Sequence, residues 1–141
     1  PAFPTRRSSD LIEFETKVAG QSVARTRSDG IIAATPTGST AYALSAGGPI
    51  LHPLLPAIVF APICPHTLGQ RPLVLDDQSL IDIEIIDLAG AHANFFVDGL
   101  RVLSLTGNEH IQIQRSTKVT RLVRNTTHNH YATLSSKLGW G

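Results

Sequence analysis

The 141-residue sequence predicts a mainly β domain with a sandwich-like architecture. Short apolar or alternating runs recur along the chain, and turn residues separate them about every 8 to 12 positions, as in β-sandwiches. Asp98-Gly99 is the strongest short hairpin signal in the chain. The stretch TAYALSAGG has helical spacing and ends on Gly-Gly-Pro, so we expect only a turn or two of helix there, after the TPTGSTAY loop, on a β scaffold.

The expected elements follow from their patterns, in chain order. IEFETKV at residues 12–18 alternates, and SVARTR returns after AGQS as its hairpin partner. GIIAAT at 30–35 and AIVFAPI at 57–63 are apolar runs typical of buried strands. SLIDIEII at 79–86 alternates, NFFVDGLRVLSL forms a hairpin, and EHIQIQRSTKVTRLVR offers two more strands. PHTLGQRPLVL is punctuated by proline and glycine, and YATLSSKLGWG predicts a loop or a short helix.

Composition limits the classes of function. The chain is 42% hydrophobic and 16% charged, which is enough apolar content for a core. Twelve basic and 11 acidic residues give no electrostatic reason to expect nucleic acid or an anionic membrane as partner. The lone Cys64 cannot form an internal disulfide, which fits a reducing compartment. No signal peptide or membrane-spanning run is visible, so we expect a cytoplasmic protein.

The first eleven residues differ from the rest of the chain. FPTRRSSDL at residues 3–11 resembles the translation of a common sequencing-adapter oligonucleotide and shares no periodicity with the residues after it. We expect residues 1–11 to be a non-native leader, and residues 12–141 to be the domain, a C-terminal fragment of a longer protein. A natural disordered tail is the alternative.

The run ATPTGSTAYALSAGGP at residues 34–49 predicts a ligand site. An apolar strand, a loop containing Gly38 and a helix start can aim backbone amides and hydroxyls at one point. Tyr42 offers a flat ring to a base. No lysine follows Gly-Ser-Thr, so the run is not a P-loop. A helix start capped by Ser39 or Thr37 is the alternative. The run contains five hydroxyl residues, Thr35, Thr37, Ser39, Thr40 and Ser45.

Other candidate groups give weaker signals. Arg25 and Arg27 alternate along a strand and are most simply a solvated face, and Asp29-Gly30 is most simply a turn. His66 fits a rigid loop between prolines. His128 and His130 have no third ligand at metal spacing, so the sequence predicts no metal site. Gly-Ser-Thr does not continue as G-x-S-x-G, which argues against a serine hydrolase.

Three segments resemble the NAD kinase family. SDGIIAATPTGSTAYALSAGGPILHP resembles the family's signature, PHTLGQRPLVL its second motif, and TLSSKLGWG its C-terminal ending. The resemblance covers nearly everything from Ile12 onward. It implies the largely β C-terminal domain of a two-domain phosphotransferase, which makes NADP from NAD with ATP or another phosphate donor and a divalent metal such as Mg²⁺. It also implies a homo-oligomer whose interface completes the NAD site.

The resemblance carries over site residues at matching positions. Tyr42 would lie near the adenine, and the small Ala41 would leave room for the ring. Asp29 would bond the dinucleotide from the neighbouring subunit, and Cys64 would pack on the ligand. Arg27 would contact ligand less consistently. The full set of cofactor-binding residues that it implies is Arg27, Asp29, Thr40, Ala41, Tyr42, Ala43, Leu44, Ser45 and Cys64.

The sequence also departs from the family. Leu100 stands where the family often has glutamine after Asp-Gly, and a leucine cannot make that side chain's hydrogen bonds. The family's Gly-Gly-Asp-Gly loop and Asn-Glu pair both lie upstream of the Ile12 position in the family, and neither is found there in this chain; the Asn-Glu at residues 108–109 is at a different place. We therefore expect no catalytic residue in this chain and no kinase activity from it alone. A non-catalytic dinucleotide-binding or oligomerisation module and a lipid kinase of the same superfamily are the alternatives. The run from GSTAY to GGP with Tyr42 favours a dinucleotide.

Overall fold

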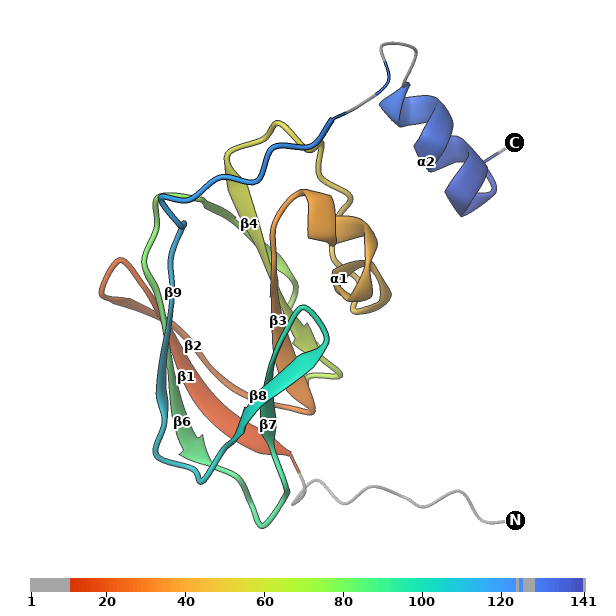
Figure 1. Ribbon diagram of the computed structural model, residues 1–141. Helices are drawn as coiled ribbons and strands as arrows, with labels where there is room; N and C mark the ends of the chain where they lie inside the picture. The colour runs from red at the N-terminus through yellow and green to blue at the C-terminus, as the bar shows by residue number, and fades with distance from the viewer. Residues whose placement is uncertain (1–10, 124, 126–128, 141) are drawn as a thin grey trace, which may run out of the picture.

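The computed structural model describes residues 11–123, 125 and 129–140. Within them it forms antiparallel sheets and three short helical segments (Figure 1). The strands are β1 Ile12–Val18, β2 Gln21–Ser28, β3 Gly30–Ala34, β4 Ala57–Ile63, β5 Leu73–Asp76, β6 Ile81–Asp87, β7 Asn94–Val97, β8 Leu100–Ser104 and β9 His110–Ile113. The helical segments are the 3-10 helix η2 Thr37–Thr40, α1 Tyr42–Ser45 and α2 His130–Leu138. The expected leader lies almost entirely outside the described residues, so its division from the domain stays a prediction.

Two sheets form the sandwich. One has the order β2-β1-β6-β9, the other β3-β4-β5, and β7 and β8 form a hairpin apart from both. Figure 1 shows the two larger sheets facing each other. Their inner faces share one core, to which the first sheet contributes Phe14, Ile81 and Ile83 and the second contributes Ile58 and Phe60. The predicted mainly β, sandwich-like fold is confirmed.

The sequence correctly located the hairpin turns where residues that favour a positive φ occur. Ala19 and Gly20 have φ of 50° and 79°, and they join β1 to β2 in a two-residue turn. Asp98 and Gly99 have φ of 49° and 81° and join β7 to β8 in the same way. The predicted short helix is present as α1, which begins at the last residue of the TPTGSTAY loop, and the loop itself contains the 3-10 helix η2.

One strand was not predicted, and one prediction about strands was wrong. β5 lies inside PHTLGQRPLVL, because β4 offers it a partner along Leu73–Asp76. The run EHIQIQRSTKVTRLVR supplies one strand, β9, and not two, because residues 114–123 pair with no sheet in the described part of the chain. The large apolar residues there are exposed, as Val119, Leu122 and Val123 show. Alternation without a neighbouring strand does not make a strand.

Helix α2 is a well-delimited element near the end of the chain. The side chain of Asn129 accepts hydrogen bonds from the backbone amides of Tyr131 and Ala132, and Gly139 ends the helix with φ of 67°. The His130 ring lies 5.1 Å from that of His52, edge to face. Of the two alternatives for this segment, the short helix is the one that forms.

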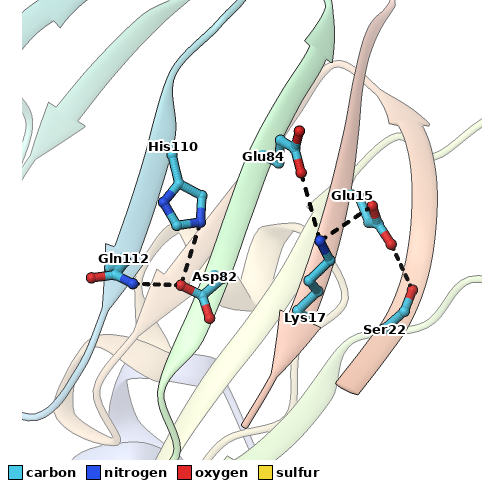
Figure 2. A network of polar contacts seen from close by, with 7 residues as sticks. All are labelled: Glu15, Lys17, Ser22, Asp82, Glu84, His110 and Gln112. Atoms are coloured by element: carbon cyan, nitrogen blue, oxygen red, sulfur yellow. Dashed lines mark hydrogen bonds and ion pairs between the residues drawn. The ribbon is translucent and has the colours of Figure 1, made fainter. Parts of the chain in front are cut away.

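The outer face of the larger sheet is polar (Figure 2). Lys17 Nζ lies 3.7 Å from Glu15 and 3.6 Å from Glu84, on neighbouring strands. Asp82 accepts a hydrogen bond from Gln112 Nε2 at 2.7 Å, and His110 Nε2 lies 3.4 Å from the same oxygen. These pairs are exposed and add little stability. They mark this face as solvated.

A carboxylate fixes the loop between β8 and β9. Glu109 accepts hydrogen bonds from the backbone amide and the hydroxyl of Thr106, at 2.6 and 2.7 Å, and from the amides of Gly107 and Asn108. The donors of Thr106 and Gly107, the Thr106 hydroxyl first, lower the pKa of Glu109 from 4.5 to about 2. The loop therefore prefers the ionised carboxylate.

We predict that Glu109→Gln lowers stability at neutral pH, because the amide cannot accept from all these donors. A lowered folded-state pKa contributes stability that is complete above about pH 4.5 and is lost as pH falls toward about 2. The difference in urea midpoint between the wild type and the variant should therefore shrink across this range. A difference that stays constant from pH 7 to pH 3 would contradict the carboxylate's role. Glu84→Gln, on the outer sheet face, is the matched control.

Candidate nucleotide-binding site

Strand β4 positions the site because both of its faces are buried. Ile58 and Phe60 point into the sandwich core, while Val59 and Ala61 point the other way. On that second face α1 packs through Ala43, which is 1% exposed. Figure 1 shows α1 beside β3 and β4. The helix therefore lies on the outer side of the smaller sheet and presents its far side to solvent.

Small residues let the chain pass close beneath α1. The Gly48 amide donates to the Ala43 carbonyl oxygen at 2.8 Å. A Cβ built on Gly48 would lie 2.7 Å from that oxygen and 3.2 Å from Val59 Cγ1. Gly47 has φ of 81°, a left-handed conformation that side chains disfavour. The two glycines of the predicted helix stop are thus needed for different reasons: Gly47 for the left-handed turn, and Gly48 for the close approach to the Ala43 backbone.

Ser39 locks the loop from inside. It is 0% exposed, its hydroxyl donates to the Pro36 carbonyl oxygen at 2.6 Å, and its Oγ accepts from the Leu51 amide at 3.0 Å. These bonds tie η2 to a segment twelve residues later. The alternative interpretation, a helix start capped by Ser39 or Thr37, is not what forms, since the N-cap residues of η2 and α1 are Pro36 and Ala41 and neither helix has a side-chain cap.

Two further hydroxyls of the run bond to the loop itself. Thr35 Oγ1 accepts from the Gly38 amide at 3.2 Å. The Thr40 hydroxyl donates a long hydrogen bond of 3.4 Å to the Thr37 carbonyl oxygen. Three of the five hydroxyls are therefore engaged in holding the loop, and a ligand is not the sole reason for their number.

The outward side of the loop carries most of the predicted site residues. Thr40, Ala41 and Ser45 are exposed, and Tyr42 is 81% exposed. Leu44 is half-buried, whereas the Ala43 side chain faces the core beneath the helix. The structure thus places Thr40, Ala41, Tyr42 and Ser45 close together along the consecutive helical segments η2 and α1, with an accessible aromatic ring.

The remaining predicted residues form a second group at the other end of β3. The Asp29 amide donates to the Ile63 carbonyl oxygen at 2.9 Å, and the His66 amide donates to the Arg27 carbonyl oxygen at 2.9 Å. These bonds place Arg27 and Asp29 beside the loop that contains Cys64. Since this group precedes β3 and the hydroxyl run follows it, five residues of strand, about 16 Å, separate their attachment points.

Arg27 lies on the polar outer face of the larger sheet. Its Nε is 3.6 Å from Glu13 Oε2, and Arg25 pairs with the other oxygen of the same carboxylate. The interpretation of this strand as a solvated face therefore describes both Arg25 and Arg27. Cys64 is exposed and has φ of 46°, a strained value for a residue with a Cβ.

Sequence reasoning missed a cavity of about 650 Å³ beside the start of the loop. It is lined by Thr35 and Pro36 at the end of β3, by residues 53–58 and by part of the segment after β9. Arg115, on its wall, pairs with Asp77 at 2.8 Å. No local pattern could have indicated it, because its walls, which also include Asp77, come from four segments that are far apart in the sequence.

The described residues hold no group of three or more His, Cys, Asp and Glu side chains placed to bind a metal ion. His66 contributes its backbone to the loop, as expected for a rigid segment. His128, the predicted neighbour of His130, lies outside the described residues. Among the described helices, none is long and apolar enough to cross a membrane.

Comparisons with known proteins identify the family. The family model described as the ATP-NAD kinase C-terminal domain matches residues 3–125. This chain belongs to the ATP-NAD kinase family. The curated NAD kinase of Nitrosococcus oceani is 47% identical over 131 residues, which are 93% of this chain and 45% of that protein. The NAD kinase of Delftia acidovorans is 45% identical over 133 residues, 94% of this chain and 44% of that protein. The chain thus spans less than half the length of these NAD kinases.

Solved NAD kinase structures share the fold. Yeast NADH kinase complexed with NADH superposes with a TM-score of 0.68 and 43% identity, covering 72% of this chain and 29% of that one. An NAD kinase from Archaeoglobus fulgidus in complex with ATP gives a TM-score of 0.67 and 34% identity, covering 79% of this chain and 42% of that one. The predicted NAD kinase resemblance is confirmed at the level of family and fold.

We predict that alanine substitution lowers stability at one glycine of this segment, Gly48, and hardly at all at another, Gly38. Gly48→Ala should destabilise the domain by about 1–3 kcal/mol, because the new methyl meets the Ala43 backbone. Gly38→Ala should change stability by less than about 0.5 kcal/mol, because its Cβ would meet only Ala34 and Thr35 at ordinary distances of 3.5 and 3.6 Å. Urea unfolding of both variants measures this difference. Equal losses would show that the close approach at Gly48 does not constrain the fold.

Proposed function

We propose that this chain is the NAD-binding part of an NAD kinase, an enzyme that transfers a phosphoryl group from ATP to the 2′-hydroxyl of the adenosine ribose of NAD. The observation that carries the proposal is the outward side of η2 and α1. There Tyr42 presents an exposed ring, flanked by the Thr40 and Ser45 hydroxyls and the small Ala41. Such a group can stack on a base and bond ribose oxygens. The family membership supports it.

The second group, around Asp29 and Cys64, fits a role in a neighbouring subunit's site. It lies at the opposite end of β3 from the hydroxyl run, and the His66 and Asp29 amides hold it in place. A homo-oligomer would let this group complete the site of another copy while Tyr42 completes its own. We infer such an assembly. Arg27 is the weakest member of the group, because Glu13 already pairs with it.

The described residues of this chain do not suit the divalent metal that the reaction needs. Among the described residues no cluster of carboxylates or histidines has metal-ligand geometry. Phosphoryl transfer depends on positioning and on neutralising charge at the phosphates. We therefore assign to this chain the binding and orientation of NAD, and to the remaining part of the kinase the metal, the phosphate donor and the base.

We expect the 141-residue chain to bind NAD and to form no NADP with ATP and Mg²⁺. Isothermal titration measures the binding, and an enzyme-coupled NADP assay measures the turnover. Fusion of the N-terminal part of the Nitrosococcus oceani NAD kinase, which this chain does not span, should restore NADP formation. NADP formation by the chain alone would refute the division of labour. A folded fusion that binds NAD without phosphorylating it would favour a non-catalytic binding module.

The Tyr42 ring should carry much of the affinity for NAD. Base–aromatic stacking is worth about 1–3 kcal/mol, so Tyr42→Ala should raise the dissociation constant roughly 5- to 150-fold. Tyr42→Phe should keep most of the affinity, since the ring remains. Tyr131→Ala on α2 is a matched control, because Tyr131 is 69% exposed and lies outside the proposed site. Unchanged affinity in Tyr42→Ala would remove Tyr42 from the site.

A further inference from the structure

Two threonines interrupt the apolar inner face of the larger sheet. Thr16 on β1 and Thr26 on β2 are only 1% and 5% exposed. The register pairs Phe14, a core residue, with Thr26, and it pairs Thr16 with Ala24. The two threonines are therefore diagonal neighbours on adjacent strands of the same face, and such neighbours lie roughly 7 to 8 Å apart. Since β2 is the edge strand of its sheet, this polar pair lies at one side of the core.

Gln70 reaches this pair from the loop between β4 and β5. Its Nε2 donates to Thr26 Oγ1 at 2.8 Å and lies 3.5 Å from the Arg25 carbonyl oxygen. The same loop donates the His66 amide to the Arg27 carbonyl oxygen at 2.9 Å. Gln70 and His66 thus fasten the β4–β5 loop to β2 at two points.

Two buried oxygens of these side chains have no hydrogen-bond partner among the described residues. They are Thr16 Oγ1 and Gln70 Oε1. A buried polar atom without a partner loses its hydration and gains nothing in return, so native proteins rarely keep one. Turning the Gln70 amide by 180° would not remove the deficit, because its NH₂ group would then take the unpaired place. Two unpaired atoms on neighbouring side chains point to one small ligand that bonds both.

A water molecule matches the chemistry of these two atoms. A threonine hydroxyl can donate and accept, whereas an amide oxygen only accepts, so a water can accept from Thr16 and donate to Gln70. With bonds of about 2.8 Å on each side, it joins polar atoms roughly 4 to 5.5 Å apart, a separation that suits diagonal neighbours. The Thr26 hydroxyl proton offers a third bond, and buried waters typically make about three. A cation would favour carboxylates, and these three side chains are neutral.

We propose that a water molecule bound between Thr16, Thr26 and Gln70 is a structural ligand of this domain and fastens the β4–β5 loop to β2. This loop supplies Cys64 to the second group of the proposed NAD site, so the water sets how firmly that group is held. The inference rests on the unpaired oxygens and not on NAD binding. A chain that holds the water and binds no NAD would refute the proposed function and leave this inference standing.

Thr16→Val tests the water site through stability, because valine has nearly the shape of threonine and lacks only the hydroxyl. With the water bound, the substitution removes one of its partners, and the urea midpoint of the 141-residue chain should fall by about 0.5 M or more. With no water, it removes a buried hydroxyl that has no partner, and the midpoint should rise. Thr120→Val, at an exposed position after β9, is the matched control and should leave the midpoint nearly unchanged.

Magnetic relaxation dispersion of the water nuclei detects the ligand itself, since it counts internal waters that exchange slowly with solvent. The wild type should hold one more such water than Thr16→Val. Thr16→Ser keeps the hydroxyl and should retain the water, although it loses a methyl group from the core. An equal number of internal waters in the wild type and Thr16→Val would overturn the proposal. So would a Thr16→Val midpoint that stays the same or rises.

Hydrogen exchange without denaturant measures the effect on the loop. The His66 amide, bonded to Arg27, should exchange about five- to tenfold faster in Thr16→Val, because local opening of the loop becomes easier. The Gly48 amide, bonded to Ala43 on the other side of the smaller sheet, should keep its rate. Equal acceleration of both amides would show a loss of stability throughout the domain and contradict the fastening of the loop by the water.

Discussion

The burial of strand β4 on both faces is the constraint on which the rest of the structure depends. Neighbouring residues of a strand point in opposite directions, so Ile58 and Phe60 fill the sandwich while Val59 and Ala61 support α1. One strand therefore belongs to two cores. The first core needs large side chains to fill the space between the sheets. The second needs small ones, because a helix and its return segment must lie close to the sheet.

This second core explains why the hydroxyl-rich run at residues 34–49 both stabilises the fold and presents exposed side chains. Ser39 turns inward and joins η2 to Leu51, while Ala43 anchors α1. With these two residues fixed, the residues between and beside them are forced outward, and Tyr42 among them is left exposed. The outward group is thus rigid because its neighbours in sequence are buried. A rigid exposed ring binds a flat ligand at a lower entropic cost than a mobile one.

The sequence predicted the parts of the fold that depend on local chemistry. Alternation located β1 and an apolar run located β4 with the observed bounds, and Asp98-Gly99 located the hairpin. It failed where a partner decides the outcome. Leu73–Asp76 becomes a strand because β4 lies beside it, and residues 114–123 do not because no strand does in the described part of the chain. Within the site, the roles of Ser39 and Gly48 depend on Leu51 and Ala43, contacts that residue spacing cannot reveal.

The exposure of Tyr42 also bears on where binding energy arises. A small-molecule site commonly buries about 70–90% of its ligand, yet a ring that is 81% exposed offers a platform with no opposing wall. A dinucleotide held by this domain alone would keep one face in water, and its hydrogen bonds would compete with solvent. Stacking can supply part of the affinity under these conditions, but discrimination between similar nucleotides needs polar groups that are shielded from water. Selectivity must then come from whatever covers Tyr42, so affinity and selectivity would be divided between this domain and the surfaces that close over it.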